Sequence, residues 1–265
     1  MKYSSRMPIA FIGHGAPTTI LTDEKYTQEL REFASKIKTP KAILMISAHW
    51  VTEELKVSSA RTPQTIYDFF GFPPELYKMQ YNAPGAPELA AQVKQLLNAK
   101  TDPDQGLDHG VWCVLKAMYP EASIPVTQLS LSAYATPEEH FAIARQLDSL
   151  RDSGILILGS GNIVHNLSVF RRANVQYNSL LPSEASTFDD SIVSLLLTNR
   201  FKDIVHYEDL PGNEFSVPTP EHFWPLIYIA ALANSQDTLE IIRTGSQYGG
   251  ISMTSLAFMP EERSQ

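Results

Sequence analysis

The sequence predicts a layered α/β fold. Short apolar runs that end at glycine or polar residues alternate along the chain with longer segments of helical periodicity. The chain has 265 residues, of which 43% are hydrophobic and 19% charged, so it can bury a large core and is not expected to be disordered. No repeat, low-complexity tract or domain boundary interrupts the alternation. We therefore expect a single domain over residues 1–265.

The first elements of the chain are two buried strands with a helix between them. The strands are expected at Ile9–Ile12 and Ala42–Ile46, because both runs are short, apolar and followed closely by glycine or a polar residue. The helix is expected from about Thr22 to Lys38, where apolar residues recur at helical spacing. Residues Leu55–Ser58 alternate in polarity and are a candidate third strand.

A long irregular segment comes next. Residues 63–87 are rich in proline and aromatic residues and lack periodicity. Loops of this length in compact domains often form the walls or lids of binding sites, and we expect an ordered segment of that kind. Helices are expected afterwards at about Ala86–Leu97 and at His109–Met118, the second of which is stopped by Pro120.

The second half of the chain continues the alternation. Thr136 and Glu139 form a capping box with proline at the first helical position, so a helix should begin there and run to about Arg151. The other elements expected are strands at Val126–Leu131, Ile155–Leu158 and about Ile251–Met259, and helices at about Ser183–Thr198 and Pro220–Ala233.

Charge and apolar runs limit the partners and the compartment. The net charge is −8 and no Lys/Arg-rich run occurs, so neither nucleic acid nor an anionic membrane surface is expected as a partner. The apolar run Pro225–Ala233 is too short to span a bilayer. The N-terminus lacks the apolar segment of a signal peptide. The single cysteine, Cys113, lies in an apolar run and is expected to be a buried thiol. Together these features indicate a cytoplasmic protein.

Histidines at expected turns are the most informative feature of the chain. Three of them follow apolar strands and two open expected helices, which are the places where α/β proteins build their sites. Histidine is the commonest metal ligand and carries protons near neutral pH. These five residues are His14, His49, His109, His165 and His222.

Three of the five are candidate site residues, each with an ordinary alternative. His14 lies between two glycines, and it is either a site residue or a surface turn residue. His49 is either a site residue or a core histidine bonded to backbone. His222 is expected in the first turn of a helix capped by Thr219, where the helix dipole favours the neutral imidazole that binds metal. Its alternative is an exposed first-turn residue.

The other two are candidates for chemistry beside a metal. His165 follows the glycine-rich turn after the strand Ile155–Leu158 and is either a ligand or a general base. His109 follows Asp108, a plausible N-cap, and either contacts substrate or packs in its helix. Asn166 supplies either a substrate hydrogen bond or a structural amide.

The remaining histidines, His140 and His206, are expected to be structural or exposed to solvent. No HExxH or CxxC pattern occurs. The residues alone favour one mononuclear metal site, which either zinc or Fe(II) would suit.

Five short motifs together resemble a known family. The chain is similar to the class III extradiol ring-cleavage dioxygenases of the LigB superfamily, and specifically to their DOPA 4,5-dioxygenase-like group. The order of the motifs, with a proline-aromatic segment between the second and third, makes the resemblance specific, and it covers nearly the whole chain. The motifs are Gly13–Pro17, Ser47–Trp50, Asp108–Trp112, Gly159–Leu167 and Thr219–Leu226.

The resemblance implies a fold, an activity and a site. The fold is a three-layer α/β/α sandwich around a mixed sheet, and the activity is the opening of a catechol ring by O₂ to a muconic semialdehyde-type product. One divalent metal ion, Zn²⁺ or Fe²⁺, would be held by His14, His49 and His222. His165 would be the acid/base residue or a fourth ligand, and His109 would contact substrate or oxygen.

One departure from the wider superfamily concerns the third ligand. Many class III enzymes hold iron with two histidines and one carboxylate. Here the third position is His222, and the adjacent Glu221 is expected to point about 100° away on a helix. A zinc-dependent hydrolase and a non-catalytic Memo-like binding protein are the alternatives. The chain could be a monomer or a small homo-oligomer.

Overall fold

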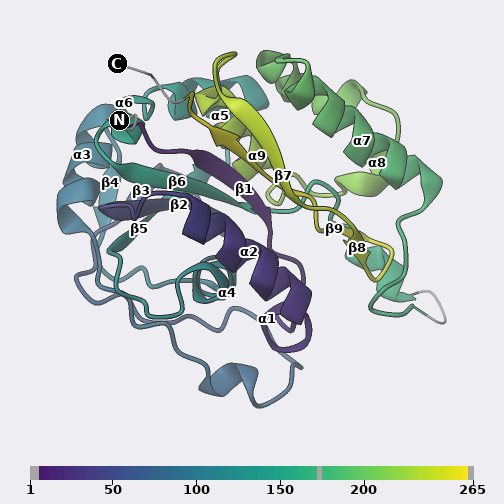
Figure 1. Cartoon of the computed structure of the whole chain (residues 1–265), viewed down its shortest axis with the longest axis horizontal. Helices are drawn as coiled ribbons and strands as arrows, with labels where there is room; N and C mark the ends of the chain where they lie inside the picture. Colours follow the sequence, from purple (N-terminus) through teal and green to yellow (C-terminus); the bar gives the residue numbers. More distant parts are fainter. Residues whose placement is uncertain (1–5, 172–174, 262–265) are drawn as a thin grey trace.

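A mixed sheet forms the centre of the molecule in the computed structural model, which describes residues 6–171 and 175–261 (Figure 1). Its eight strands lie in the order β4-β3-β5-β2-β6-β1-β10-β7, and β8 and β9 form a separate two-stranded sheet. The strands are β1 (Ile9–Gly13), β2 (Ala42–Thr52), β3 (Lys56–Ser58), β4 (Lys100–Asp102), β5 (Val126–Ser132), β6 (Ile155–Gly161), β7 (Thr238–Arg243), β8 (Ser246–Gln247), β9 (Ile251–Ser252) and β10 (Ser255–Met259).

Helices cover both faces of this sheet. The α-helices are α1 (Thr19–Thr22), α2 (Glu24–Lys36), α3 (Pro87–Leu97), α4 (His109–Met118), α5 (Pro137–Arg145), α6 (Ser149–Asp152), α7 (Ser183–Leu197), α8 (Asn213–Ser216) and α9 (Trp224–Leu232). Three 3₁₀ segments are η1 (Leu76–Lys78), η2 (Leu167–Arg171) and η3 (Phe201–Asp209).

The helices form one layer on each face of the sheet (Figure 1), and each layer packs on its own apolar core. Alternate residues of a strand face opposite sides of the sheet. Accordingly Ala10 and Ile43 pack with α2 and α4, whereas Phe11 and Leu44 pack with α3, α5, α7 and α9. Every residue of α9 is buried, because this helix lies between the sheet and the outer helices. The predicted three-layer α/β/α sandwich around a mixed sheet is confirmed.

Three adjacent parallel strands position the site. β6 pairs in parallel with β1 on one side and with β2 on the other, so the carboxyl ends of all three meet at one edge of the sheet. β1 and β6 are buried along their whole length, as strands covered on both faces must be. The segments that follow these three strands are therefore brought together although they are far apart in sequence.

Several boundaries differ from the sequence predictions. The edge strands β4 and β7 were not expected, since β4 is polar throughout and Glu240 interrupts the apolar residues of β7. The helix expected to run to Arg151 is broken into α5 and α6. The helix expected from about Thr22 to Lys38 is α2, which is preceded by the short unpredicted helix α1. The final expected strand is interrupted between β9 and β10, where Met253 and Thr254 leave the sheet.

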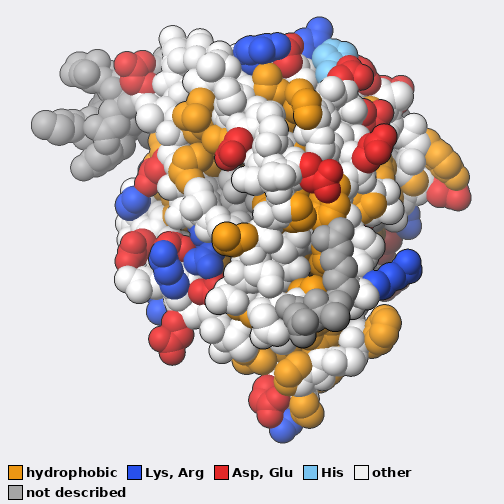
Figure 2. Space-filling view, turned by 90° about the vertical axis from the view of Figure 1, so that its right-hand side faces the viewer, with side chains coloured by type: hydrophobic (Ala, Val, Ile, Leu, Met, Phe, Trp, Pro, Cys, Tyr) orange, Lys and Arg blue, Asp and Glu red, His pale blue; other side chains and the backbone are white. Residues whose placement is uncertain are grey.

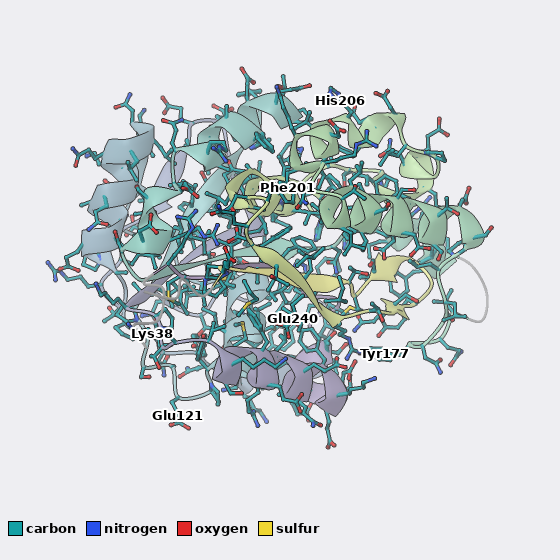
Figure 3. All side chains as sticks on the ribbon, turned by 45° about the horizontal axis from the view of Figure 1, so that its top comes forward. Lys38, Glu121, Tyr177, Phe201, His206 and Glu240 are labelled. Carbon is teal, nitrogen blue, oxygen red and sulfur yellow. The ribbon has the colours of Figure 1, made fainter. Side chains whose placement is uncertain are left out.

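Residues outside the site have the expected environments. Cys113 is buried. His140 is buried and its Nδ1 lies 3.2 Å from the hydroxyl of Tyr228, so its role is structural. His206 is exposed and lies at the periphery of the molecule (Figure 3).

The surface of the described residues carries charges of both signs. Acidic and basic side chains are interspersed on the face in Figure 2, among small groups of hydrophobic ones. Within residues 6–171 and 175–261 no helix has both the length and the apolar character needed to cross a membrane. Lys2, near the N-terminus, lies outside the described residues.

His140 should make stability sensitive to acid. Burial lowers its pKa from 6.5 to about 4, so between these values the unfolded chain binds a proton that the folded chain does not. The free energy of unfolding therefore falls as pH falls through this window, by up to about 1.4 kcal/mol per pH unit for one group. In urea titrations from pH 7 to 4, His140→Gln should reduce that slope, whereas the exposed-residue control His206→Gln should not. Equal slopes in wild type and His140→Gln would contradict the assignment.

Candidate metal centre and substrate pocket

All five turn histidines converge on one pocket. Its volume is about 700 Å³, and it opens at the edge of the sheet where β1, β2 and β6 end. The side chains that line it combine titratable and aromatic groups. They include His14, His49, His109, His165, His222, Asp68, Glu221, Phe69, Phe72, Phe170 and Tyr248.

His14 directly follows β1, as predicted. Its Nδ1 lies 3.0 Å from Ser160 Oγ, and that hydroxyl donates its one proton to the carbonyl oxygen of Gly110. Ser160 Oγ can therefore only accept from His14, so the proton of the neutral imidazole must be on Nδ1. The Nε2 of His14 keeps a free lone pair, which is the form that binds a metal.

His49 lies inside a strand that is longer than predicted. β2 pairs regularly with β5 up to Ile46, and the register shifts before pairing resumes at Val51. Irregularities of this kind re-aim side chains at the rim of a sheet, and His49 enters the pocket from this stretch. His49 Nδ1 lies 3.3 Å from Asp68 Oδ2, and His49 Nε2 lies 3.2 Å from His14 Nε2.

His222 lies before a helix and not in its first turn. The helix predicted over Pro220–Ala233 begins at Trp224, so Thr219 is not its cap. β6 holds the turn in place, because the amide of Asn162 donates to His222 O at 2.9 Å. Gly161 passes so close that a Cβ on it would lie 2.1 Å from the same oxygen. Only glycine leaves room for the turn at that point.

The expectation that Glu221 points away from the site is wrong. Its Oε1 lies 3.0 Å from His222 Nδ1 and accepts a hydrogen bond from Thr219 Oγ1 at 2.8 Å. Residues 221–223 form a turn, so the 100° separation of neighbours on a helix does not apply to them. A carboxylate at this position favours a proton on His222 Nδ1. His222 Nε2 is buried and has no hydrogen-bond partner among the described residues.

His165 lies flat against His222. The two ring centroids are 3.5 Å apart and the ring planes differ by 7°. The backbone of His165 is held on both sides, by a bridge to Ile251 and by donation of its amide to Ser216 O at 2.9 Å. The side-chain NH₂ group of the neighbouring Asn166 donates a hydrogen bond to Phe215 O at 2.8 Å, which supports a structural role for this residue.

His109 opens α4, as predicted. Its backbone amide donates to Asp68 Oδ1 at 2.9 Å, and its Nδ1 lies 3.0 Å from the same oxygen. Asp108 occupies the N-cap position but makes no side-chain capping bond; its Oδ1 instead accepts from Ser47 Oγ at 2.7 Å. The start of α4 is thereby joined to β2 and to the proline-aromatic segment.

Burial keeps several of these histidines neutral. It lowers the pKa of His49 to about 3, with help from the neighbouring His109, and that of His165 to about 4. Burial also lowers the pKa of His14 and His222 well below the usual value, and the other histidines add to the effect. Neutral imidazoles are the ones that can bind a metal ion.

The donor atoms fit a divalent metal ion. The ligand atoms of His14, His49 and His109 lie within 4.8 Å of one another, as do those of His165, Glu221 and His222. Ligands 2.0–2.1 Å from a tetrahedral ion stand about 3.3 Å apart, close to the 3.2 Å between His14 Nε2 and His49 Nε2. Ser160 leaves His14 Nε2 without a proton, and the charge of Asp68 beside His49 Nδ1 favours the same for His49. Two unprotonated Nε2 atoms at this distance repel each other unless a cation lies beside them.

Aromatic side chains form the walls of the pocket. Phe69 and Phe72, from the predicted wall segment, line it directly. Tyr67 lies behind them, with its hydroxyl bonded to Met79 O at 2.7 Å. Phe170 supplies a further aromatic group.

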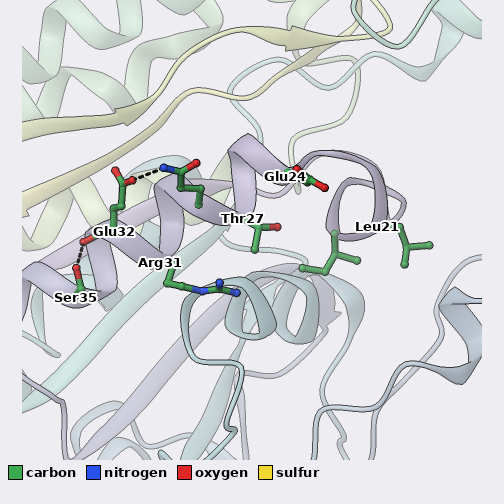
Figure 4. A pocket seen from close by; sticks show the side chains of 8 residues that line it. Leu21, Glu24, Thr27, Arg31, Glu32 and Ser35 are labelled. Carbon is green, nitrogen blue, oxygen red and sulfur yellow. Dashed lines mark hydrogen bonds between the residues drawn. The ribbon is translucent and has the colours of Figure 1, made fainter.

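Another hollow lies on the outside of α1 and α2 (Figure 4). Its volume is about 430 Å³, and none of the five histidines contributes to it. Gln28 Nε2 donates to Glu32 Oε1 at 2.7 Å, so part of its polar lining is already paired. The hollow offers no donor set comparable to the histidine pocket.

Sequence reasoning missed Ser160 and Asp68 and misplaced Glu221. Ser160 lies within the glycine-rich motif, which was a usable signal, and Glu221 is adjacent to a predicted ligand. Asp68 lies in the proline-aromatic segment, where no periodicity indicates which side chains face the site. Its contacts depend on how that segment folds back over β2 and α4.

Residues 8–259 match the family model described as the catalytic LigB subunit of aromatic ring-opening dioxygenase. The chain belongs to this LigB family. It is an extradiol ring-cleavage dioxygenase and therefore an oxidoreductase. The match spans the whole sheet and all five histidines, and it confirms the resemblance inferred from the motifs. LigB extradiol dioxygenases depend on a metal, and the histidine-rich pocket offers a place for one.

Named relatives extend over nearly the full chain. A 4,5-DOPA dioxygenase extradiol of Escherichia coli K12 is 38% identical over 96% of this chain and 95% of its own. A protein of the same name from Beta vulgaris is 37% identical over 94% of this chain and 95% of its own. The crystal structure of an uncharacterized Escherichia coli K12 protein superposes with a TM-score of 0.80 at 34% identity, covering 96% of this chain and 100% of the other. These likenesses favour ring cleavage over the hydrolase and the non-catalytic alternatives.

Gly161→Ala should disturb the site through the backbone. The added Cβ would lie 2.1 Å from His222 O, so the turn that carries His222 must move, at a cost of about 1–3 kcal/mol. A lower melting temperature together with less than one bound metal per chain is expected. Gly71→Ala is the control, since its Cβ meets nothing within 4 Å although its φ of +75° adds strain. That control should lose some stability and keep its metal; full metal occupancy in Gly161→Ala would contradict the prediction.

Proposed function

We propose that this single catalytic domain opens the ring of a catechol, DOPA or a close relative, with O₂ to give a muconic semialdehyde-type product. The observation that carries the proposal is the approach of His14 Nε2 to His49 Nε2, 3.2 Å apart, in a pocket that is also lined by His222, whose buried Nε2 has no hydrogen-bond partner among the described residues. The names of the relatives support DOPA as the first substrate to test.

His14, His49 and His222 would hold the metal. Their ring centroids are 5.0, 5.4 and 4.9 Å apart, a nearly equal triangle. Each has its Nδ1 against an oxygen atom, from Ser160, Asp68 and Glu221 respectively, and this leaves Nε2 for the ion. Bound there, a divalent ion supplies positive charge that lowers the phenol pKa and brings catechol and O₂ together. Zn²⁺ suits the same ligands but is redox-inactive, so we propose Fe²⁺ for turnover.

His165 would act as the general base. Its ring is parallel to that of His222 at 3.5 Å, and imidazole lone pairs lie in the ring planes. Two parallel stacked rings do not direct their lone pairs at a common point, which favours a base over a fourth ligand. With its pKa lowered to about 4, His165 is neutral near pH 7 and can accept the second phenolic proton.

His109 and the aromatic walls would orient the substrate. His109 Nδ1 faces Asp68, so its Nε2 is free to contact a catechol oxygen or O₂. Phe69 packs edge-on against His109 with ring centroids 5.6 Å apart, and it would place an apolar face beside the substrate ring. Closing the pocket with aromatic groups keeps water away from the reacting oxygens. A small aromatic molecule and O₂ are thus the partners, in a protein that we propose is cytoplasmic and either a monomer or a small homo-oligomer.

The activity is tested by oxygen uptake. Protein reconstituted anaerobically with Fe²⁺ should consume about one O₂ per DOPA and produce the visible absorbance of a muconic semialdehyde. Phenol, which lacks the second hydroxyl, should not be consumed. His49→Ala is the matched control, because it should lose the metal and with it the uptake. No uptake with any of a panel of catechols, at full metal occupancy, would refute the proposal.

His165→Gln separates a base from a ligand. Glutamine keeps a polar side chain but cannot act as a base, so turnover should fall by about 10²–10⁴-fold. Metal content, measured by elemental analysis of the same preparation, should stay at the wild-type level. Loss of the metal in this variant would show instead that His165 is primarily a ligand.

A further inference from the structure

We propose that Asp68 is a positioning residue that fixes the tautomer of His49 and so determines metal affinity. The inference rests on the proposed function, in which His49 is a ligand through Nε2. Asp68 lies in the proline-aromatic segment and is not itself a proposed metal ligand. Its basis is the set of contacts that one carboxylate makes with two different site histidines.

The carboxylate of Asp68 faces three nitrogen atoms. Its Oδ1 accepts from the backbone amide of His109 at 2.9 Å and lies 3.0 Å from His109 Nδ1. Its Oδ2 lies 3.3 Å from His49 Nδ1. The backbone amide of His109 donates a hydrogen bond to this carboxylate, and the two Nδ1 atoms lie within ion-pair distance of it. An ionised carboxylate donates no hydrogen bond, so its negative charge favours a proton on a facing imidazole nitrogen. For neutral His49 this places the proton on Nδ1 and leaves Nε2 unprotonated.

The tautomer of His49 affects metal binding because its Nε2 faces the Nε2 of a second proposed ligand. His49 Nε2 faces His14 Nε2 at 3.2 Å, and Ser160 already requires the latter to be unprotonated. Without Asp68, the most favourable arrangement in the absence of metal has His49 Nε2 donating a proton to His14 Nε2. That hydrogen bond would occupy two of the three ligand atoms. Asp68 therefore holds the metal-free protein in the arrangement that is ready to bind.

Asparagine at this position tests the argument closely. Its amide has nearly the shape of the carboxylate, but it offers one acceptor oxygen and one NH₂ group, which only donates. The oxygen can keep the hydrogen bond from the backbone amide of His109, and the NH₂ group then faces His49 Nδ1. His49 must become an acceptor there, which moves its proton to Nε2. Asp68→Asn should thus damage the metal site without removing a ligand.

Asp68 also connects the substrate wall to the metal ligands. It lies next to Phe69, whose ring lines the pocket and packs against His109. A movement of this wall would shift the carboxylate, and with it the contacts that it makes with both histidines. The position of Asp68 therefore links the shape of the substrate pocket to the tautomer of His49 that binds metal.

The first experiment measures zinc binding to metal-free protein by competition with a chromophoric chelator. Asp68→Asn should bind Zn²⁺ about 10–100-fold more weakly than wild type. Asp104→Asn is the matched control, because Asp104 is exposed, and the substitution changes the net charge equally but lies outside the pocket. Equal zinc affinity in folded Asp68→Asn and wild type would overturn the inference. Absence of tight binding in wild type would instead refute the proposed metal site itself.

The second experiment does not depend on the variant. Long-range ¹H–¹⁵N spectra of metal-free wild type at neutral pH distinguish the two neutral tautomers of each histidine, and His49→Gln identifies the signals of His49. The Nδ1–H tautomer is expected for His49 in wild type, and the Nε2–H tautomer in Asp68→Asn. Finding Nε2–H in the folded wild-type protein would overturn the inference even if Asp68→Asn failed to fold.

Discussion

Parallel pairing of β1, β6 and β2 is the constraint on which the rest of the structure depends. Because the three strands are adjacent and point the same way, their carboxyl ends bring His14, His49 and His165 to one edge of the sheet. β6 extends this arrangement to a fourth histidine, since Asn162 and the close passage of Gly161 hold the turn of His222. A site assembled from such distant segments requires the whole sheet to be in register.

The negative charges of this site lie behind the proposed ligands and not among them. The three proposed ligands are neutral imidazoles, and the carboxylates lie one step further out, where Asp68 and Glu221 face Nδ1 atoms. A set of two histidines and a carboxylate places negative charge directly on a metal. Here the same charge would act through hydrogen bonds, which also orient the imidazole rings. The difference between this chain and the wider superfamily is thus smaller than the ligand residues alone suggest.

Much of the fold and of the site could be predicted from residue patterns. Apolar runs such as Ile9–Ile12 mark buried strands because only a covered strand can be apolar on both faces. The edge strands β4 and β7 escaped prediction, since strands that are partly exposed lack such runs. The five histidines were recognisable by their motifs, and all of them line one pocket. Their individual roles as ligand or base stay predictions.

The sequence by itself determined the layered fold, the family and the candidate histidines, because periodicity and short motifs are local properties of the chain. Only the tertiary structure decided which atoms face one another. It placed Asp68 against His49 and His109, and it turned Glu221 towards His222. The physical reason is that the proton position of a neutral imidazole is determined by its hydrogen-bond partner. Those partners come from segments whose folding no local pattern specifies.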